Sequence, residues 1–95
     1  MNIGFLGLGK LGLPVSLAVE NKGHKIFGYD ISKQTLSDIR NRKIRYREEW
    51  VDKYLPNTKL EINDIDQLVK NSEIIFVPIQ TPHDPQYEGI TRIPE

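Results

Sequence analysis

Two short and almost continuous apolar runs occur along the chain, at Ile3 to Leu8 and at Ile74 to Ile79. Such runs are typical of strands that are buried on both faces of a parallel sheet. Lys25 to Asp30 has the composition of a further strand, and Lys59 to Ile62 alternates like a short one. The pattern therefore predicts about four strands.

The segments between these strands have helical periodicity. Apolar side chains recur at three- and four-residue spacing from about residue 11 to residue 22, namely at Leu11, Val15, Ala18 and Val19. Ser32 is a suitable N-cap for a second helix, which we expect to end near Asn41. Shorter helices are predicted over 48–55 and 64–70. Alternating strands and helices predict an α/β fold with right-handed crossovers.

Composition excludes several classes of function. The chain has 95 residues, of which 38% are hydrophobic, enough for one small domain. Its 13 Lys and Arg balance its 13 Asp and Glu, so no overall positive field favours nucleic acid or an anionic membrane as partner. No apolar run is long enough for a membrane span, and the N-terminus lacks signal-peptide features. We therefore expect a cytoplasmic setting.

The residues from Gly7 to Gly12 form a G-x-G-x-x-G motif, which follows a predicted strand and opens a predicted helix. Asp30 stands at the end of the next strand, as in a Rossmann dinucleotide-binding unit. Gly7 permits a tight turn, Gly9 lets a pyrophosphate approach the backbone, and Gly12 lets helix and strand pack closely. The helix N-terminus attracts the anion. Because the Asp30 carboxylate accepts from ribose hydroxyls and repels a 2′-phosphate, NAD(H) is expected rather than NADP.

Three segments also carry a family resemblance: Gly9 to Pro14, Gly28 to Ile31 and Ile74 to Pro82. Together they resemble the N-terminal NAD-binding domain of the UDP-glucose/GDP-mannose dehydrogenase family. The resemblance implies a Rossmann-like parallel sheet, N-terminal part only, over residues 1–81, with residues 82–95 as a proline-containing extended tail. It also implies that the turn after the fourth strand lies along the cofactor. The predicted cofactor-binding residues are Gly7, Leu8, Gly9, Lys10, Leu11, Gly12, Asp30 and Thr81.

Members of this family oxidise the C6 alcohol of a nucleotide sugar to a carboxylate with two NAD, through a thiol adduct. The resemblance implies that later domains supply the sugar-nucleotide site and the catalytic cysteine. This chain has no cysteine, so we expect it to be the cofactor-binding part of such an enzyme and inactive alone. Two alternatives remain: an NAD(H)-sensing module without turnover, and the cofactor domain of a β-hydroxyacid dehydrogenase, which Ile3 to Gly9 also resembles. The Gln80-Thr81-Pro82 turn argues against the latter.

Other polar features are expected to be structural. We expect the Lys10 side chain to lie in solvent rather than on a phosphate. Tyr46 and Trp50 are expected to cover the core edge, and His83 beside Asp84 is not expected to be a catalytic dyad. Two histidines do not make a metal site. A local basic patch is expected to be a solvated helix end, at Arg40, Arg42, Lys43, Arg45 and Arg47.

Two further expectations concern the cofactor contact and the sheet edge. The family often has a basic residue five positions after the ribose acid, where this chain has Thr35, with Lys33 nearby. A contact between adenosine and a basic side chain is therefore not assigned. The open end of the sheet after the fourth strand exposes an edge and an apolar face, which favours association, for instance into a homo-oligomer.

Overall fold

The alternating order of strands and helices is confirmed by a computed structural model, which describes residues 1–78. Along the chain, the elements are β1 (Asn2–Leu6), α1 (Gly12–Asn21), β2 (Lys25–Tyr29), α2 (Lys33–Arg40), α3 (Glu49–Tyr54), a 3₁₀ turn (Leu55–Asn57), β3 (Glu61–Ile62), α4 (Ile65–Asn71) and β4 (Ile74–Phe76). The predicted domain boundary at residue 81 and the predicted tail lie outside the described residues.

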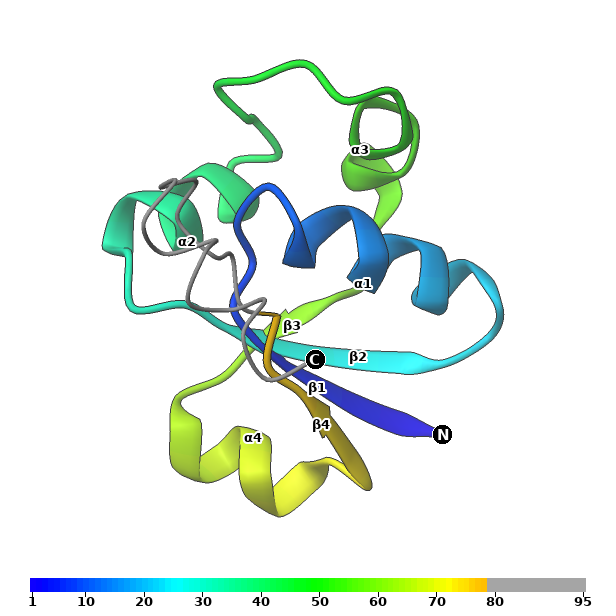
Figure 1. The fold of residues 1–95 in the computed structure, drawn as a ribbon, viewed down its shortest axis with the longest axis vertical. Helices are drawn as coiled ribbons and strands as arrows, with labels where there is room; N and C mark the ends of the chain where they lie inside the picture. Colours follow the sequence, from blue (N-terminus) through cyan, green and yellow to red (C-terminus); the bar gives the residue numbers. More distant parts are fainter. Residues whose placement is uncertain (79–95) are drawn as a thin grey trace, which may run out of the picture.

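The four strands form one parallel sheet in the order β3-β2-β1-β4. Helices α1, α2 and α3 lie on one side of this sheet, and α4 lies on the other (Figure 1). This is the predicted Rossmann-like α/β fold. Since all strands run in the same direction, the carboxyl ends of β1, β2 and β4 meet at one edge of the sheet, where ligands bind in open α/β sheets.

Both faces of β1 are buried, as its apolar run predicts. Phe5 is 1% exposed, and Gly4 lets α4 approach so closely that an added Cβ would lie 2.7 Å from Cδ2 of Leu68. Burial of one such side chain contributes about 1.5–3 kcal/mol. The main core, on the α1 side, consists of Ile3, Phe5, Leu8, Leu13, Leu17, Ile26, Leu36, Ile39, Val51, Leu55 and Leu60.

The apolar positions that indicate α1 are not the ones that this helix buries. Leu11 and Val15 are 49% and 45% exposed, and the buried residues are Gly12, Leu13, Ser16 and Leu17. The Ser16 hydroxyl can be buried because it donates to the Leu13 carbonyl at 2.7 Å. A count of apolar residues alone overlooks a glycine and a bonded serine, although these small residues allow the helix to lie close to the sheet.

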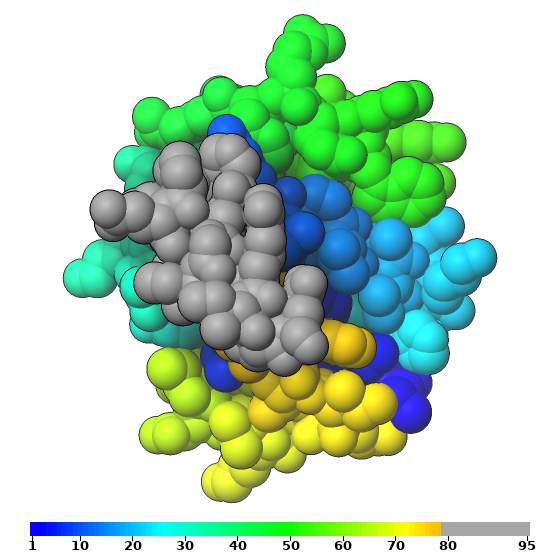
Figure 2. Space-filling model, viewed as in Figure 1, coloured from blue at the N-terminus to red at the C-terminus, as the bar shows by residue number. Residues whose placement is uncertain are grey.

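The prediction that the fourth strand is buried on both faces is wrong. β4 pairs only with β1, through Ile3 with Ile74 and Phe5 with Phe76, and its other edge is free among the described residues. Ile74 and Phe76 are 43% and 47% exposed. The surfaces of α4 and β4 adjoin at one end of the molecule (Figure 2). The expected open edge with apolar side chains is therefore present.

The turns that flank α2 follow the sequence prediction. The Ser32 hydroxyl accepts from the Thr35 amide at 3.1 Å, and the helix ends at Arg40, with Asn41 as its C-cap. Arg42 then adopts a positive φ of 58°, and its guanidinium donates to the carbonyls of Ile39 at 2.6 Å and Thr58 at 3.2 Å. This arginine of the basic patch thus fastens the segment after α2 to the rest of the fold.

Candidate functional site

The glycine loop between β1 and α1 is held by its own backbone. Gly7 has a φ of +131°, which favours glycine, and its amide donates to the carbonyl of Tyr29 at 2.8 Å. A Cβ on Gly12 would lie 2.0 Å from the carbonyl oxygen of Gly7. Both glycines therefore have the predicted roles, a tight turn and close packing of the helix against it.

Gly9 differs, because a Cβ at this position would meet no atom within 4 Å. Nothing in the fold of the described residues requires a glycine here. Open space above an exposed backbone is what a phosphate group needs in order to approach the amides of a strand-to-helix turn. The absence of a side chain at Gly9 thus fits the anion-binding role that the motif predicts.

The N-terminus of α1 is not capped by a side chain. Its N-cap, Leu11, makes no capping hydrogen bond, and its first turn holds no acidic residue. In contrast, Ser32, Glu48 and Asp64 each accept from an amide of α2, α3 or α4. The Leu13 amide donates to the Gly9 carbonyl at 3.0 Å, and Pro14 has no N–H, so the donors at the start of α1 are the amides before Leu13. The start of the helix adds a partial positive charge beside Gly9.

Asp30 lies where the glycine loop meets the end of β2. Its Oδ2 accepts from the Leu8 amide at 2.8 Å, and its Oδ1 accepts from the Ser32 amide at 2.8 Å. The carboxylate thus ties the loop to the start of α2. Each carboxylate oxygen has a further lone pair, so these two bonds leave capacity for the hydroxyls of a ribose.

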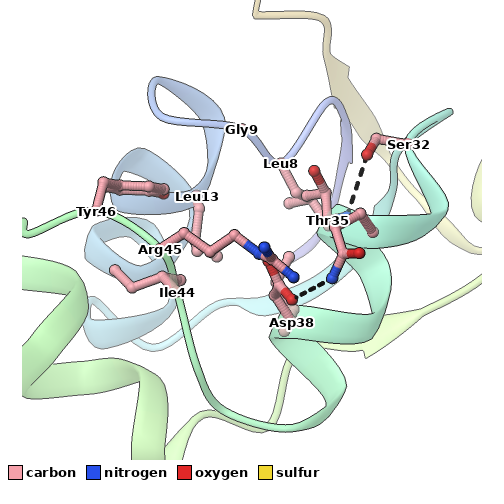
Figure 3. Close-up of a pocket in the computed structure, with 11 residues that line it drawn as sticks. Leu8, Gly9, Leu13, Ser32, Thr35, Asp38, Ile44, Arg45 and Tyr46 are labelled. Atoms are coloured by element: carbon pink, nitrogen blue, oxygen red, sulfur yellow. Dashed lines mark hydrogen bonds and ion pairs between the residues drawn. The ribbon is translucent and has the colours of Figure 1, made fainter.

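Two hollows flank the corner formed by Asp30 and the glycine loop. One of about 350 Å³ has mostly apolar walls, which include Tyr29, Ile31 and Ile65 as well as Asp30. The other, of about 190 Å³, lies between the glycine loop, α2 and the segment 44–46 (Figure 3). A flat apolar ring could be sheltered in the first. The second combines apolar side chains, such as Leu13 and Ile44, with polar ones, such as Asp38.

Lys10 is exposed, as expected, but it is not free in solvent. Its ammonium lies 5.6 Å from the centroid of the Tyr46 ring, a cation–π distance. Burial raises the pKa of the Tyr46 phenol, and the nearby Glu48 carboxylate raises it further. Trp50 covers the core edge as predicted, with its ring 4.5 Å from that of Tyr54. Tyr46 instead lies beside the glycine loop, which its sequence position does not indicate.

The structure brings together all of the predicted cofactor-binding residues except Thr81, which lies outside the described residues, as do His83 and Asp84. Pro78, shortly after β4, does approach the loop: its carbonyl oxygen is 3.5 Å from the position of a Cβ on Gly7. Within residues 1–78, no group of three or more acidic or histidine side chains could hold a metal ion. None of the helices in this range is long and apolar enough to cross a membrane.

Two known proteins are similar in sequence to most of this chain. Protein CapL from Staphylococcus aureus is 35% identical over 83 residues, which cover 87% of this chain and 19% of that protein. UDP-N-acetyl-D-mannosamine dehydrogenase from Pyrococcus horikoshii is 30% identical over 86 residues, which cover 86% of this chain and 21% of that protein. The chain thus spans about a fifth of the length of these relatives.

Solved structures agree in fold. The ternary complex of GDP-mannose dehydrogenase from Pseudomonas aeruginosa matches 90% of this chain and 21% of its own, with a TM-score of 0.74 and 23% identity. The UDP-D-ManNAc dehydrogenase from Pyrococcus horikoshii matches 97% of this chain and 24% of its own, with a TM-score of 0.71 and 26% identity. The model of the family described as "UDP-glucose/GDP-mannose dehydrogenase family, NAD binding domain" matches residues 1–91, and the chain therefore belongs to this family.

Proposed function

We propose that the chain binds NAD across the corner formed by the glycine loop and Asp30. The pyrophosphate lies over Gly9 at the uncapped start of α1, the adenosine ribose bonds to Asp30, and the adenine occupies the apolar hollow beside Ile31 and Ile65. The observation that carries this proposal is the open space above Gly9. Within residues 1–78 no atom fills that space, which lies next to the amides that precede Leu13 and near a carboxylate with accepting capacity.

We further propose that the chain is the cofactor-binding part of a nucleotide-sugar 6-dehydrogenase. Family membership and relatives that are named as dehydrogenases of UDP-sugars support this. When bound, NAD supplies a hydride acceptor for oxidation of the sugar C6 alcohol. The thiol adduct that the family resemblance implies needs a cysteine, and these 95 residues have none, so the proposed role of this chain is cofactor binding alone. We expect the chain alone to produce no NADH when it is mixed with a UDP- or GDP-sugar and NAD.

The residues of this chain would contribute binding and orientation. The amides at the start of α1 hold the phosphates, and Asp30 holds the ribose in one orientation because its own position is fixed by the amides of Leu8 and Ser32. The described residues form the adenosine side of the site and leave the nicotinamide side largely unbuilt. We therefore expect NAD to bind this chain weakly, and the binding assay must cover millimolar concentrations.

Gly9→Ala tests the proposal most cleanly, because the new methyl group meets no atom of residues 1–78 and lies in the expected place of the pyrophosphate. We expect the free energy of unfolding to change by less than about 1 kcal/mol. The Kd for NAD, measured by titration of backbone amide shifts, should rise about tenfold or more, which corresponds to about 1.4 kcal/mol.

Gly23→Ala is the matched control for this change, since it makes the same substitution beyond the other end of α1. Gly23 has a φ of +101°, so alanine there is strained and should lower stability without any effect on NAD binding. Unchanged NAD binding in Gly9→Ala would show that the glycine loop is not part of the cofactor site. A preference of the unsubstituted chain for NADP would contradict the role of Asp30.

A further inference from the structure

An ion pair lies in the smaller cavity, beside the corner that holds the ribose in the proposed function. Nε of Arg45 lies 3.3 Å from Oδ2 of Asp38, and Nε2 of Gln34 donates to Oδ1 of Asp38 at 2.7 Å. Both oxygens of this carboxylate are therefore engaged. The Asp38 side chain is 21% exposed, whereas that of Arg45 is 72% exposed, so the carboxylate is the fixed member of the pair.

This cavity adjoins the place where a 2′ substituent of the ribose would be. Its lining includes Gly9 and Ser32, and the Ser32 amide donates to Asp30. In dinucleotide-binding folds, the acidic residue after the second strand binds the ribose 2′-hydroxyl, and an arginine nearby accommodates the 2′-phosphate of NADP. Arg45 is the arginine that reaches this cavity from the segment after α2 (Figure 3).

The other candidate cations near this corner are placed differently. The Arg42 guanidinium is held by two backbone carbonyls, those of Ile39 and Thr58. Lys33 is exposed on the first turn of α2 and does not line the cavity. Among the described residues, Arg45 is the one cation that lines the cavity, and the Asp38 carboxylate lies directly against it. Its availability to an anion is therefore set by Asp38.

We propose that Asp38 is a specificity-determining residue of the cofactor site: it occupies Arg45, keeps this guanidinium from a 2′-phosphate, and so adds to the preference for NAD over NADP. The inference rests on the proposed function. Two carboxylates then oppose NADP in different ways. Asp30 repels the phosphate at the ribose, and Asp38 withholds the cation that would bind it. Neither effect requires Asp38 to touch NAD.

Asp38→Asn tests this, since asparagine keeps an oxygen for Gln34 and removes the charge that holds Arg45. The chain should remain folded, because a partly exposed ion pair contributes little to stability. We expect the Kd for NADP to fall about tenfold and that for NAD to change less than about twofold. Asp30 is retained, so NADP should still bind more weakly than NAD. Amide-shift titrations with NAD and NADP give both constants.

The double variant Asp38→Asn with Arg45→Met should return the ratio of the two constants to that of the unsubstituted chain. As a matched control, Asp38→Asn with Lys33→Met removes a cation outside the cavity and should retain the gain. An unchanged ratio in Asp38→Asn, or a gain that survives the loss of Arg45, would overturn the proposal while NAD binding stands. If the unsubstituted chain binds no NAD at all, the proposed function fails, and this inference fails with it.

Discussion

The starts of α1 and α2 lie at the same edge of the sheet, yet their first amides are satisfied in different ways. At α2, the Ser32 hydroxyl caps the helix, and the Ser32 amide is itself bonded to Asp30. At α1, Leu11 provides no cap and the first turn has no acid. A cap contributes about 1 kcal/mol, so its absence is a cost to the free protein. The start of α2 thus has a side-chain cap, whereas the start of α1 has none and is where we propose that the pyrophosphate binds.

A similar contrast exists within the glycine loop itself. Gly12 is required by the fold, because the carbonyl of Gly7 occupies the space that a side chain would need. Gly9 is not required by the fold, because its surroundings are open. Of these two glycines, Gly12 therefore has a role in packing, and Gly9 has the binding role that we propose. A substitution at Gly12 should therefore change mainly the free energy of unfolding, and one at Gly9 mainly the affinity for NAD.

The largest effect is expected at Gly12. In Gly12→Ala the Cβ would lie 2.0 Å from the Gly7 oxygen, so the helix must move away from the turn. We expect the free energy of unfolding to fall by about 3 kcal/mol or more, measured by urea denaturation. Gly9→Ala, in the same loop, should stay close to the unsubstituted chain. Equal stability of the two variants would remove the distinction between a packing glycine and a binding glycine.

A smaller effect is expected at the capped helix. Ser32→Ala removes the hydroxyl that accepts from the Thr35 amide, and should lower the free energy of unfolding by about 1 kcal/mol. Ser32→Asp is the conservative control, because its carboxylate can accept the same hydrogen bond and should restore most of the loss. If Ser32→Ala is as stable as the unsubstituted chain, the start of α2 does not depend on its cap.

At the uncapped helix, a new carboxylate should have opposite effects on folding and on binding. Leu11 is half-exposed, so Leu11→Asp removes little from the core and places a negative charge at the start of α1. We expect a gain in stability of about 0.3–1 kcal/mol and a weaker affinity for NAD. Leu11→Asn, without the charge, should leave the affinity nearer to that of the unsubstituted chain. An unchanged affinity in Leu11→Asp would mean that the anion binds elsewhere.

The smallest effect concerns pH. The pKa of Tyr46 is raised in the folded chain, chiefly by burial and then by Glu48, so the folded state favours the neutral phenol. The unfolded chain loses this proton first, near the ordinary tyrosine pKa of about 10. Stability should therefore fall as the pH rises above that value towards the raised pKa. Tyr46→Phe should lack this part of the decline, and identical alkaline profiles of the two chains would contradict it.

The parts of the site that are local in sequence could be predicted, and those that depend on a long loop could not. Gly7 to Gly12 and Asp30 belong to one strand-helix-strand unit, whose geometry is nearly independent of the rest of the chain. The position of Tyr46 beside Lys10 depends on the segment after α2, which Arg42 turns through a positive φ and fastens to distant carbonyls. No periodicity or motif in the sequence predicts where this segment lies.

For the fold too, local features could be predicted and those that depend on distant contacts could not. The order of strands and helices along the chain follows from short apolar runs joined by helices, and the caps at Ser32 and Asp64 mark helix starts directly. The buried face of α1 was hidden by its small residues, since burial of Ser16 depends on a local hydrogen bond rather than on hydrophobicity. Exposure of β4 could not be inferred from its apolar run, because an edge strand and a central strand can have the same composition.

The most direct test of the central claim is a map of amide shifts during titration of the 95-residue chain with NAD. If the uncapped start of α1 is the anion site, the largest shifts occur at Gly9, Lys10 and Leu11, with smaller ones near Asp30 and Ile65 and none at the opposite end of α1, at Lys22 and Gly23. Gly9→Ala should greatly reduce these shifts at the same NAD concentration. Shifts that cluster away from the glycine loop, or that persist unchanged in Gly9→Ala, would contradict the claim.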